Sequence, residues 1–456
     1  MPLAPAASPK LPEELWASIF EYCDSTPPSI VKARLEPSLD LTKSTNQTLK
    51  TISVVSKNWR RIVLPLLFTS ACLQLDLRQW AEEIPRVAKR VDKRADVSTS
   101  RSADAQDGLV DYKPWIPSAI EDFCGFVLAA QLAPVVQSFV LVIDRSYRSN
   151  EKASPEQRRR HSKRPSPAVA AALWQYILSI IDPGRVVIMA PPNELHSVVS
   201  PTEWRPHDGD WVWTMTNLQM LELRQEQHVT PKPVGAALRS PALTRSKHGP
   251  CLLVLREWQH LGLNEGSFLP AYGTYDYFER GAPLLVQSIT RRFGWDYQSG
   301  SSSGCRWAEL LSSVHSFTYT AIFPFATHTR PVRWLQNLEV LDVQLAPDPQ
   351  SGMLDDKSQT GRADLQDCWR ELLSVYRDAA DMEFQRTKGG ASRLRKIICR
   401  DAQISALRAD LSQAFHGLTS PRVARIGRVY QWSEEDEPGV FIKHARESGS
   451  KGHLLT

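Results

Sequence analysis

The chain has 456 residues, of which 42% are hydrophobic, and it contains 14 Trp. This content can bury a sizeable core, which excludes a wholly disordered protein. No run of 18 apolar residues occurs, and the first ten residues lack a basic stretch followed by an apolar one, so we expect a cytoplasmic or nuclear protein without membrane spans. The net charge is +5, and residues 145–167 alone hold eight basic and two acidic residues. Because the remainder is close to neutral, we expect no direct nucleic-acid binding.

Two apolar stripes near the start of the chain predict helices. The first helix begins at Pro12, and its apolar face has the spacing i, i+4, i+7 in Leu15, Ile19 and Tyr22. The second stripe steps by three, four and three residues, which predicts one helix carrying Ile52, Val55, Trp59 and Ile62. Pro65 is expected to end that second helix. Between the two stripes, residues 23–47 are rich in Ser, Thr and Pro and predict a loop.

A seven-residue frame, N-L-x-x-L-x-L, occurs at 217–223 and again at 337–343. This spacing is typical of a short strand with alternate residues buried. Weaker copies and one apolar run predict further strands, so the set is centred near 139, 188, 221, 255, 317, 341, 397 and 426, with one more expected at 284–289. Helices are predicted at 119–132, 168–181, 307–314, 365–376 and 404–415. Strand and helix alternation indicates stacked units with one continuous core, and an ordinary α/β domain is the alternative.

The N-terminal blocks resemble an F-box. They read L-P-E-E-L-W-A-S-I-F at 11–20, then L-K-T-I-S-V-V-S-K-N-W-R-R-I at 49–62, then P-L-L-F at 65–68 as in fungal members. The resemblance implies a three-helix module that docks on the Skp-type adaptor of cullin-RING ubiquitin ligases. It also implies that the docking face and the core of the module are supplied by Leu11, Pro12, Leu15, Ile19, Val55 and Trp59. The spacer at 23–47 is longer than the family usually carries, so the second short helix of the motif is expected near 30–35.

We therefore predict an α+β protein in three parts. The F-box helical module covers 8–70, and a linker with a disordered part at 86–108 covers 76–118. An irregular leucine-rich-repeat-like α/β solenoid covers 119–456, with loops at 145–167 and 346–364. Such repeats often follow an F-box, and here the strand surface would recruit a client. Candidate strand-surface residues are Gln219, Glu222, Glu339 and Asp342, although a solvated strand face is the plainer interpretation.

The resemblance implies a non-enzymatic substrate-recognition subunit of an SCF-type ligase, with a Skp-type adaptor, a cullin and an unidentified protein client as partners. Seven scattered Cys without a C-x-x-C pair predict neither a metal site nor a disulfide framework, and we expect no cofactor. The G-x-S-x-G match at 300–304 lies in a Ser/Gly run and indicates a loop. A nuclear scaffold and an unrecognised enzyme, with His196, His207 and Asp208 as an imaginable site, remain alternatives. The basic run at 158–164 is a possible nuclear import signal.

Overall fold

The structure is a computed structural model. It describes residues 11–43, 46–76, 116–144, 167–199, 217–225, 251–273, 311–326, 337–388, 392–419 and 430–445. Predictions for 86–108, the His207 and Asp208 pair, the basic run at 158–164, the G-x-S-x-G match at 300–304, and the strands at 284–289 and near 426 lie outside these residues. Among the described helices, none combines the length and the apolar character needed to cross a bilayer.

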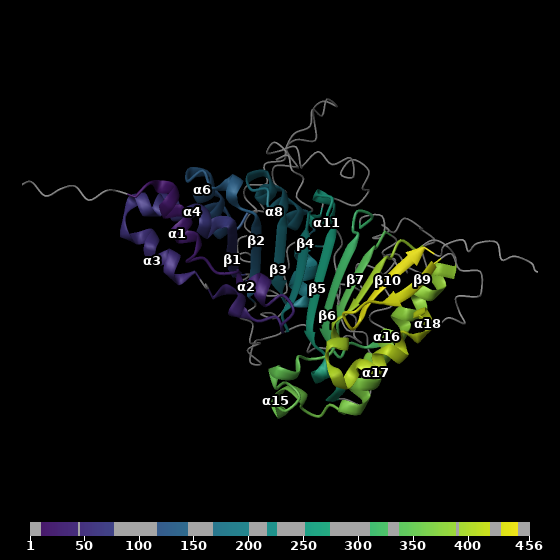
Figure 1. Cartoon of the computed structure of the whole chain (residues 1–456). Helices are drawn as coiled ribbons and strands as arrows, with labels where there is room; N and C mark the ends of the chain where they lie inside the picture. The colour runs from purple at the N-terminus through teal and green to yellow at the C-terminus, as the bar shows by residue number, and fades with distance from the viewer. Residues whose placement is uncertain are drawn as a thin grey trace, which may run out of the picture.

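In the described part of the chain, one ten-stranded sheet organises a mixed α/β architecture (Figure 1). The strands are β1 (Ser70–Asp76), β2 (Ser138–Asp144), β3 (Arg185–Ala190), β4 (Gln219–Arg224), β5 (His260–Ser267), β6 (Ser316–Ile322), β7 (Val340–Gln344), β8 (Lys396–Cys399), β9 (Tyr430–Glu434) and β10 (Val440–Ala445). Their order is β1-β2-β3-β4-β5-β6-β7-β8-β10-β9, so neighbours in the sheet are neighbours in the chain as far as β8. Successive strands of the chain therefore lie side by side in the sheet as far as β8.

The α-helices are α1 (Glu13–Glu21), α2 (Pro28–Val31), α3 (Gln47–Val55), α4 (Lys57–Thr69), α6 (Ser118–Ala129), α8 (Pro167–Ile180), α9 (Pro192–Val199), α11 (Leu252–Leu255), α15 (Lys357–Thr360), α16 (Leu365–Lys388), α17 (Ser405–Ala414) and α18 (His416–Thr419). The 3-10 helices are η1 (Leu39–Thr42), η3 (Ala133–Val135), η6 (Leu269–Gly273), η9 (Pro349–Ser351) and η10 (Arg400–Gln403).

Strand direction separates the two copies of the repeated frame. Strand β7 runs parallel to both its neighbours, whereas β4 runs antiparallel to both β3 and β5. The frame specifies which alternate residues are buried, and that pattern is the same whichever way a strand points. Identical spacing therefore predicted two strands correctly but carried no information about their direction.

One face of the sheet, which we call the helix face, packs against the helices. Alternate strand residues such as Phe139, Ile188, Leu221, Phe317 and Leu341 join buried residues of α6, α8, α9, α11, α16 and α17 in one continuous hydrophobic core. The predicted helices at 119–132, 168–181, 365–376 and 404–415 correspond to α6, α8, α16 and α17, and α16 extends twelve residues further than expected.

The opposite face of the sheet is crossed by residues 24–43, which we call the crossing segment. It contains α2 and η1, and Leu41 packs into a second core with Val140, Val142, Val187 and Met189. We call this side of the sheet the crossed face. The prediction of a simple loop at 23–47 was wrong, because the few apolar residues of this segment find a prepared apolar patch on the strands. Helix α2 overlaps the position of the short helix expected near 30–35, but it contacts the crossed face of the sheet through Ser29.

The second N-terminal stripe forms two helices rather than one. Ser56 adopts an extended backbone (φ −154°, ψ 159°) between α3 and α4, and its hydroxyl accepts the Trp59 backbone N–H at 3.1 Å as an N-cap. Pro65 lies inside α4 instead of ending it. The φ angle of proline is compatible with a helix, and the missing N–H removes only one backbone hydrogen bond from α4. The apolar contacts of the last turn can therefore hold the helix together.

Four other sequence predictions need correction. The strand expected near 255 is helix α11, and the strand follows it as β5, whose sequence HLGLNEGS has low strand propensity. The described residues of the helix predicted at 307–314 form a turn. The loop expected at 346–364 includes η9 and α15, and Met353 and Leu354 pack against the main core. Finally, β1 occupies 70–76, where the expected module ends and the expected linker starts.

Candidate functional site

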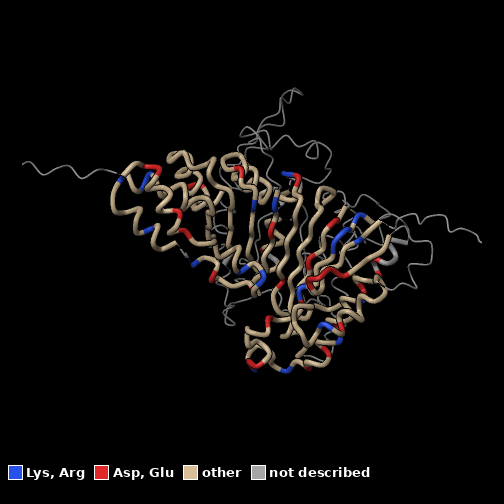
Figure 2. Tube along the Cα trace, viewed as in Figure 1, with Lys and Arg blue, Asp and Glu red and all other residues tan. Residues whose placement is uncertain are grey.

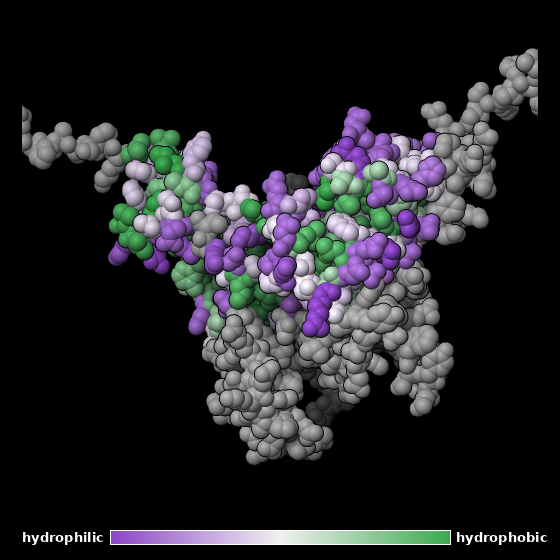
Figure 3. Space-filling model, turned by 90° about the horizontal axis from the view of Figure 1, so that it is seen from below, coloured by the Kyte–Doolittle hydropathy of each residue, from purple (hydrophilic) through white to green (hydrophobic). Residues whose placement is uncertain are grey.

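The first candidate site is the outer surface of the N-terminal module, which we define as α1, α3 and α4. Leu11, Leu15, Ile19 and Val55 are 45%, 49%, 44% and 59% exposed. Apolar side chains gather at this end of the molecule, drawn green at the left of Figure 3. Burial of large side chains is the main source of binding free energy. This surface can therefore accept an apolar partner.

A small core holds the helices of this module in place. Phe20, Leu49, Ile62 and Val63 are buried, and Trp59 packs against them from α4. The Trp59 ring lies 5.1 Å from the Trp16 ring and 5.4 Å from the Phe20 ring, measured between centroids. Of the six residues implied by the resemblance, Trp59 is thus partly buried, whereas the five others, Leu11, Pro12, Leu15, Ile19 and Val55, are exposed.

Charged contacts also join α1 and α4. Arg61 of α4 forms an ion pair with Glu13 in the first turn of α1. A carboxylate at this position complements the partial positive charge of the helix N-terminus. The pair is exposed, so it orients the two helices but contributes little stability.

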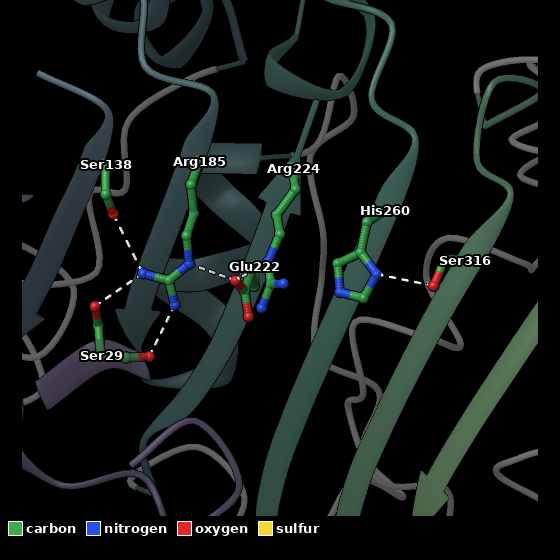
Figure 4. Close-up of polar contacts among 7 residues, drawn as sticks. All are labelled: Ser29, Ser138, Arg185, Glu222, Arg224, His260 and Ser316. Carbon is green, nitrogen blue, oxygen red and sulfur yellow. Dashed lines mark hydrogen bonds and ion pairs between the residues drawn. The ribbon is translucent and has the colours of Figure 1, made fainter. Parts of the chain in front are cut away.

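The second candidate site is the polar part of the crossed face, where the two charge signs are interspersed along the strands (Figure 2). Figure 4 shows a row of polar side chains that runs across β2 to β6 and is met by Ser29 of the crossing segment. Arg185 lies at its centre: its guanidinium donates to the Ser29 carbonyl at 2.8 Å, to the Ser29 hydroxyl at 2.9 Å and to the Ser138 hydroxyl at 3.2 Å. It also pairs with Glu222, which accepts from Arg224 at 2.5 Å.

The ionisation of this row follows from its surroundings. Burial raises the pKa of Glu222, but hydrogen bonds and charges from Arg224 and Arg185 outweigh that effect, so its pKa is lowered from the usual value. Burial, with a contribution from Arg224, lowers the pKa of His260 to about 4. At neutral pH the row therefore holds an ionised Glu222 and a neutral His260.

His260 and Ser316 supply part of a nucleophile-and-base arrangement. The His260 Nδ1 atom lies 3.0 Å from the Ser316 hydroxyl. A serine nucleophile also needs a carboxylate or carbonyl that orients the imidazole. Among the described contacts Glu222 bonds to the two arginines and not to His260. The row as it stands is arranged for holding the crossing segment.

A second carboxylate on the crossed face holds the same segment. Asp342 of β7 pairs with Arg34 at 2.5 Å and with Arg400 at 3.1 Å. Between the two carboxylates, the Asn264 side-chain amide donates to the carbonyls of Ala33 at 2.9 Å and Leu35 at 2.7 Å. The crossing segment is therefore attached to β3, β5 and β7 by specific polar contacts.

The four strand-surface candidates do not form one surface. Glu222 and Asp342 point to the crossed face and are buried in ion pairs, so the interpretation of these two residues as a solvated strand face was wrong. Gln219 is buried, and it shares the alternation of Leu221 on the helix face. Glu339 precedes β7 and lies 3.7 Å from Arg395. The frame predicted the strand positions of Gln219, Glu222 and Asp342 but not the partners of these residues.

Sequence reasoning overlooked Ser29, Arg34, Arg185, His260 and Asn264. Their contacts join residues 156, 308 and 231 positions apart in the chain. No local motif signals such pairs. A buried arginine in an otherwise apolar strand was the available clue, since a buried charge needs a partner.

Buried acids on the helix face are structural groups. Glu265 accepts the Tyr319 hydroxyl at 2.6 Å, and burial raises its pKa to about 8. Asp401 accepts the backbone N–H groups of Leu345 and Ala346 and the Tyr376 hydroxyl, and burial raises its pKa to about 6. Within the described ranges, no three His, Cys, Asp or Glu side chains form a group able to hold a metal ion.

Comparison with known proteins returns no relative for this chain. No protein-family model, no curated protein and no solved structure matches it.

Proposed function

We propose that this chain is the substrate-recognition subunit of a cullin-RING ubiquitin ligase of the SCF type. The N-terminal module binds a Skp-type adaptor, and through it a cullin, while the sheet domain holds a protein client. In this proposal the module is an F-box, and the sheet domain is an irregular solenoid of leucine-rich-repeat type. The chain-ordered strands with helices on one face support the solenoid interpretation, and the reversed β4 is its main departure.

The observation that carries the proposal is the exposed apolar surface of the module. Leu15 and Ile19 lie one turn apart on α1 and are both about half exposed, although Phe20 of the same helix is buried. Full burial of a large apolar side chain stabilises by about 1.5–3 kcal/mol. Four half-exposed residues could therefore contribute several kcal/mol to an adaptor complex.

The test is a triple variant, Leu15→Ala, Ile19→Ala and Val55→Ala, in a pull-down with a purified Skp-type adaptor. We expect binding to be lost while the melting temperature stays near that of the wild-type protein, because the three side chains are exposed. Trp59→Ala is unsuitable for this purpose, since it removes part of the module core.

The matched control is Leu128→Ala, which removes an exposed apolar residue of α6 outside the module. We expect this control to bind the adaptor normally. Adaptor binding by the triple variant at wild-type strength would refute the proposal. Co-purification of a cullin then distinguishes a ligase subunit from a nuclear scaffold that uses the same module.

A further inference from the structure

Strand β1 lies at one end of the sheet, beside the N-terminal module, and β2 is its only partner among the described strands (Figure 1). The Thr69 carbonyl, just before the strand, accepts the Gln137 N–H at 3.0 Å and so points toward β2. Alternation along a strand then directs the backbone N–H and C=O groups of Ser70, Cys72 and Gln74 outward. Among the described residues no hydrogen bond reaches these outward groups. An unpaired edge of this kind is a template for another strand.

A cavity of about 390 Å³ follows this outer edge. Its walls include Cys72 and Gln74 on the crossed face of β1 and Ala71 on the helix face. Lining residues from both faces of one strand mean that the cavity extends around the edge of that strand. The volume lies within the range of about 300–1,000 Å³ that is usual for ligand sites. Cys72 and Gln74 are themselves exposed.

The two sides of the cavity differ in chemistry. On the crossed-face side, Lys43 and Lys50 line it, and no carboxylate is present among the lining residues that are described. Lys43 pairs with Asp40 at 2.6 Å, whereas Lys50 has no acidic partner among the described residues. Partial burial raises the pKa of the Cys72 thiol and the charge of Lys50 opposes that rise, which agrees with a lysine close to the edge.

On the helix-face side the cavity is aromatic. Phe68 and Phe123 line it, with their rings stacked at 6.4 Å between centroids. The exposed Phe126 ring continues this surface, 5.3 Å from Phe68.

We propose that the outer edge of β1 binds an extended peptide segment of a partner protein, in which acidic residues alternate with apolar ones. Successive side chains of an added strand point to opposite faces of the sheet. Acidic side chains at every second position would therefore face Lys43 and Lys50, and the apolar side chains between them would face Phe68 and Phe123. The backbone of the peptide would pair with the outward groups of Cys72 and Gln74, as in other cases of strand addition.

A partner peptide fits this edge better than a second copy of the same chain. Two copies paired edge to edge would bring together rims that both carry Lys43 and Lys50, and like charges in close register are unfavourable. The inference is independent of adaptor binding, because the exposed apolar residues of α1 do not line the cavity.

The test uses a fluorescent synthetic peptide of eight residues that alternates Glu with Val, titrated into the full-length protein and followed by anisotropy. Two comparison peptides carry Lys in place of Glu, or the same composition with Glu and Val in separate blocks. We expect binding only by the alternating acidic peptide. Amide hydrogen exchange should then slow at Cys72 and Gln74 while Ala71 and Leu73, whose backbone groups point to β2, change little.

Two pairs of variants locate the site. Gln74→Pro removes an outward N–H and should weaken peptide binding roughly twofold to tenfold. Gln74→Ala keeps that N–H and should bind the peptide as the wild-type protein does. Lys50→Glu should weaken binding roughly threefold to tenfold, whereas Lys57→Glu, exposed on α4 and outside the cavity, should have no effect.

Three outcomes would overturn the proposal. The first is equal binding of all three peptides or of Gln74→Pro and Gln74→Ala. The second is slow exchange of the Cys72 and Gln74 amides before peptide is added, which would mean that the chain itself already covers the edge. The third is a dimer in sedimentation that Gln74→Pro dissociates, which would assign the edge to a second copy.

Discussion

Removal of the Glu222 charge is the most informative perturbation of the crossed face. The Arg185 side chain is 11% exposed and that of Glu222 is 6% exposed. In Glu222→Gln, Arg185 would keep its neutral oxygen partners on Ser29 and Ser138 but would lose its carboxylate. Breaking a buried ion pair by changing one partner typically costs about 3–5 kcal/mol. The glutamine amide oxygen still accepts a hydrogen bond, so we expect a loss of about 3 kcal/mol in the free energy of unfolding.

The measurement is urea unfolding at pH 7, in which an unchanged slope with a lower midpoint indicates a change in stability alone. The matched control is Glu339→Gln, whose side chain is 32% exposed and lies 3.7 Å from an Arg395 side chain that is 75% exposed. An exposed pair of this kind contributes about 0–1 kcal/mol. Equal losses in the two variants would refute the assignment of Glu222 as the carboxylate that fixes the crossing segment.

The pH dependence gives an independent check on Glu222. Because its folded-state pKa is lowered from 4.5, its ionised form stabilises the protein above about pH 4.5, and this stabilisation is lost as the pH falls through the folded-state value. The difference in stability between wild type and Glu222→Gln should therefore shrink below pH 4.5. A constant difference from pH 7 to pH 3 would contradict this reasoning.

Two further predictions concern single positions. The pKa of His260 is about 4 in the folded protein and 6.5 ordinarily, so at this residue the unfolded chain binds an extra proton between these values. The contribution of His260 to stability should therefore fall by about 2 kcal/mol from pH 7.5 to pH 5, measured as the change in the stability difference between wild type and His260→Asn in urea unfolding at the two pH values. Gly439 has φ +81°, and a Cβ atom there would overlap the Cys399 carbonyl oxygen. Gly439→Ala should cost about 3 kcal/mol or more, whereas Gly125→Ala, with open space in α6, should be neutral or stabilising by about 0.5–1 kcal/mol. Similar melting temperatures for the two alanine variants would show that the backbone near Gly439 can move freely.

Local sequence patterns predicted many individual elements. Alternation placed β2, β4, β6, β7 and β8, a continuous apolar run placed β3, and the 3.6-residue period placed α1, α6, α8 and α17. None of these patterns predicted β5, because Asn264 and Glu265 interrupt its apolar sequence. The Asn264 amide donates to the Ala33 and Leu35 carbonyls, and Glu265 accepts the Tyr319 hydroxyl, so both polar residues find partners that are distant in sequence.

For the candidate sites, the sequence alone determined which residues of the N-terminal module are apolar and how they are spaced. The tertiary structure decided that Leu15 and Ile19 face outward while Trp59 packs inward, because that division depends on where α4 lies against α1. The tertiary structure alone also brought Arg34 to Asp342 across 308 residues, set the direction of β4 and left β1 at an edge of the sheet. Helix and strand periods come from interactions between near neighbours, whereas ion pairs, strand direction and sheet edges depend on which distant segments meet when the core closes.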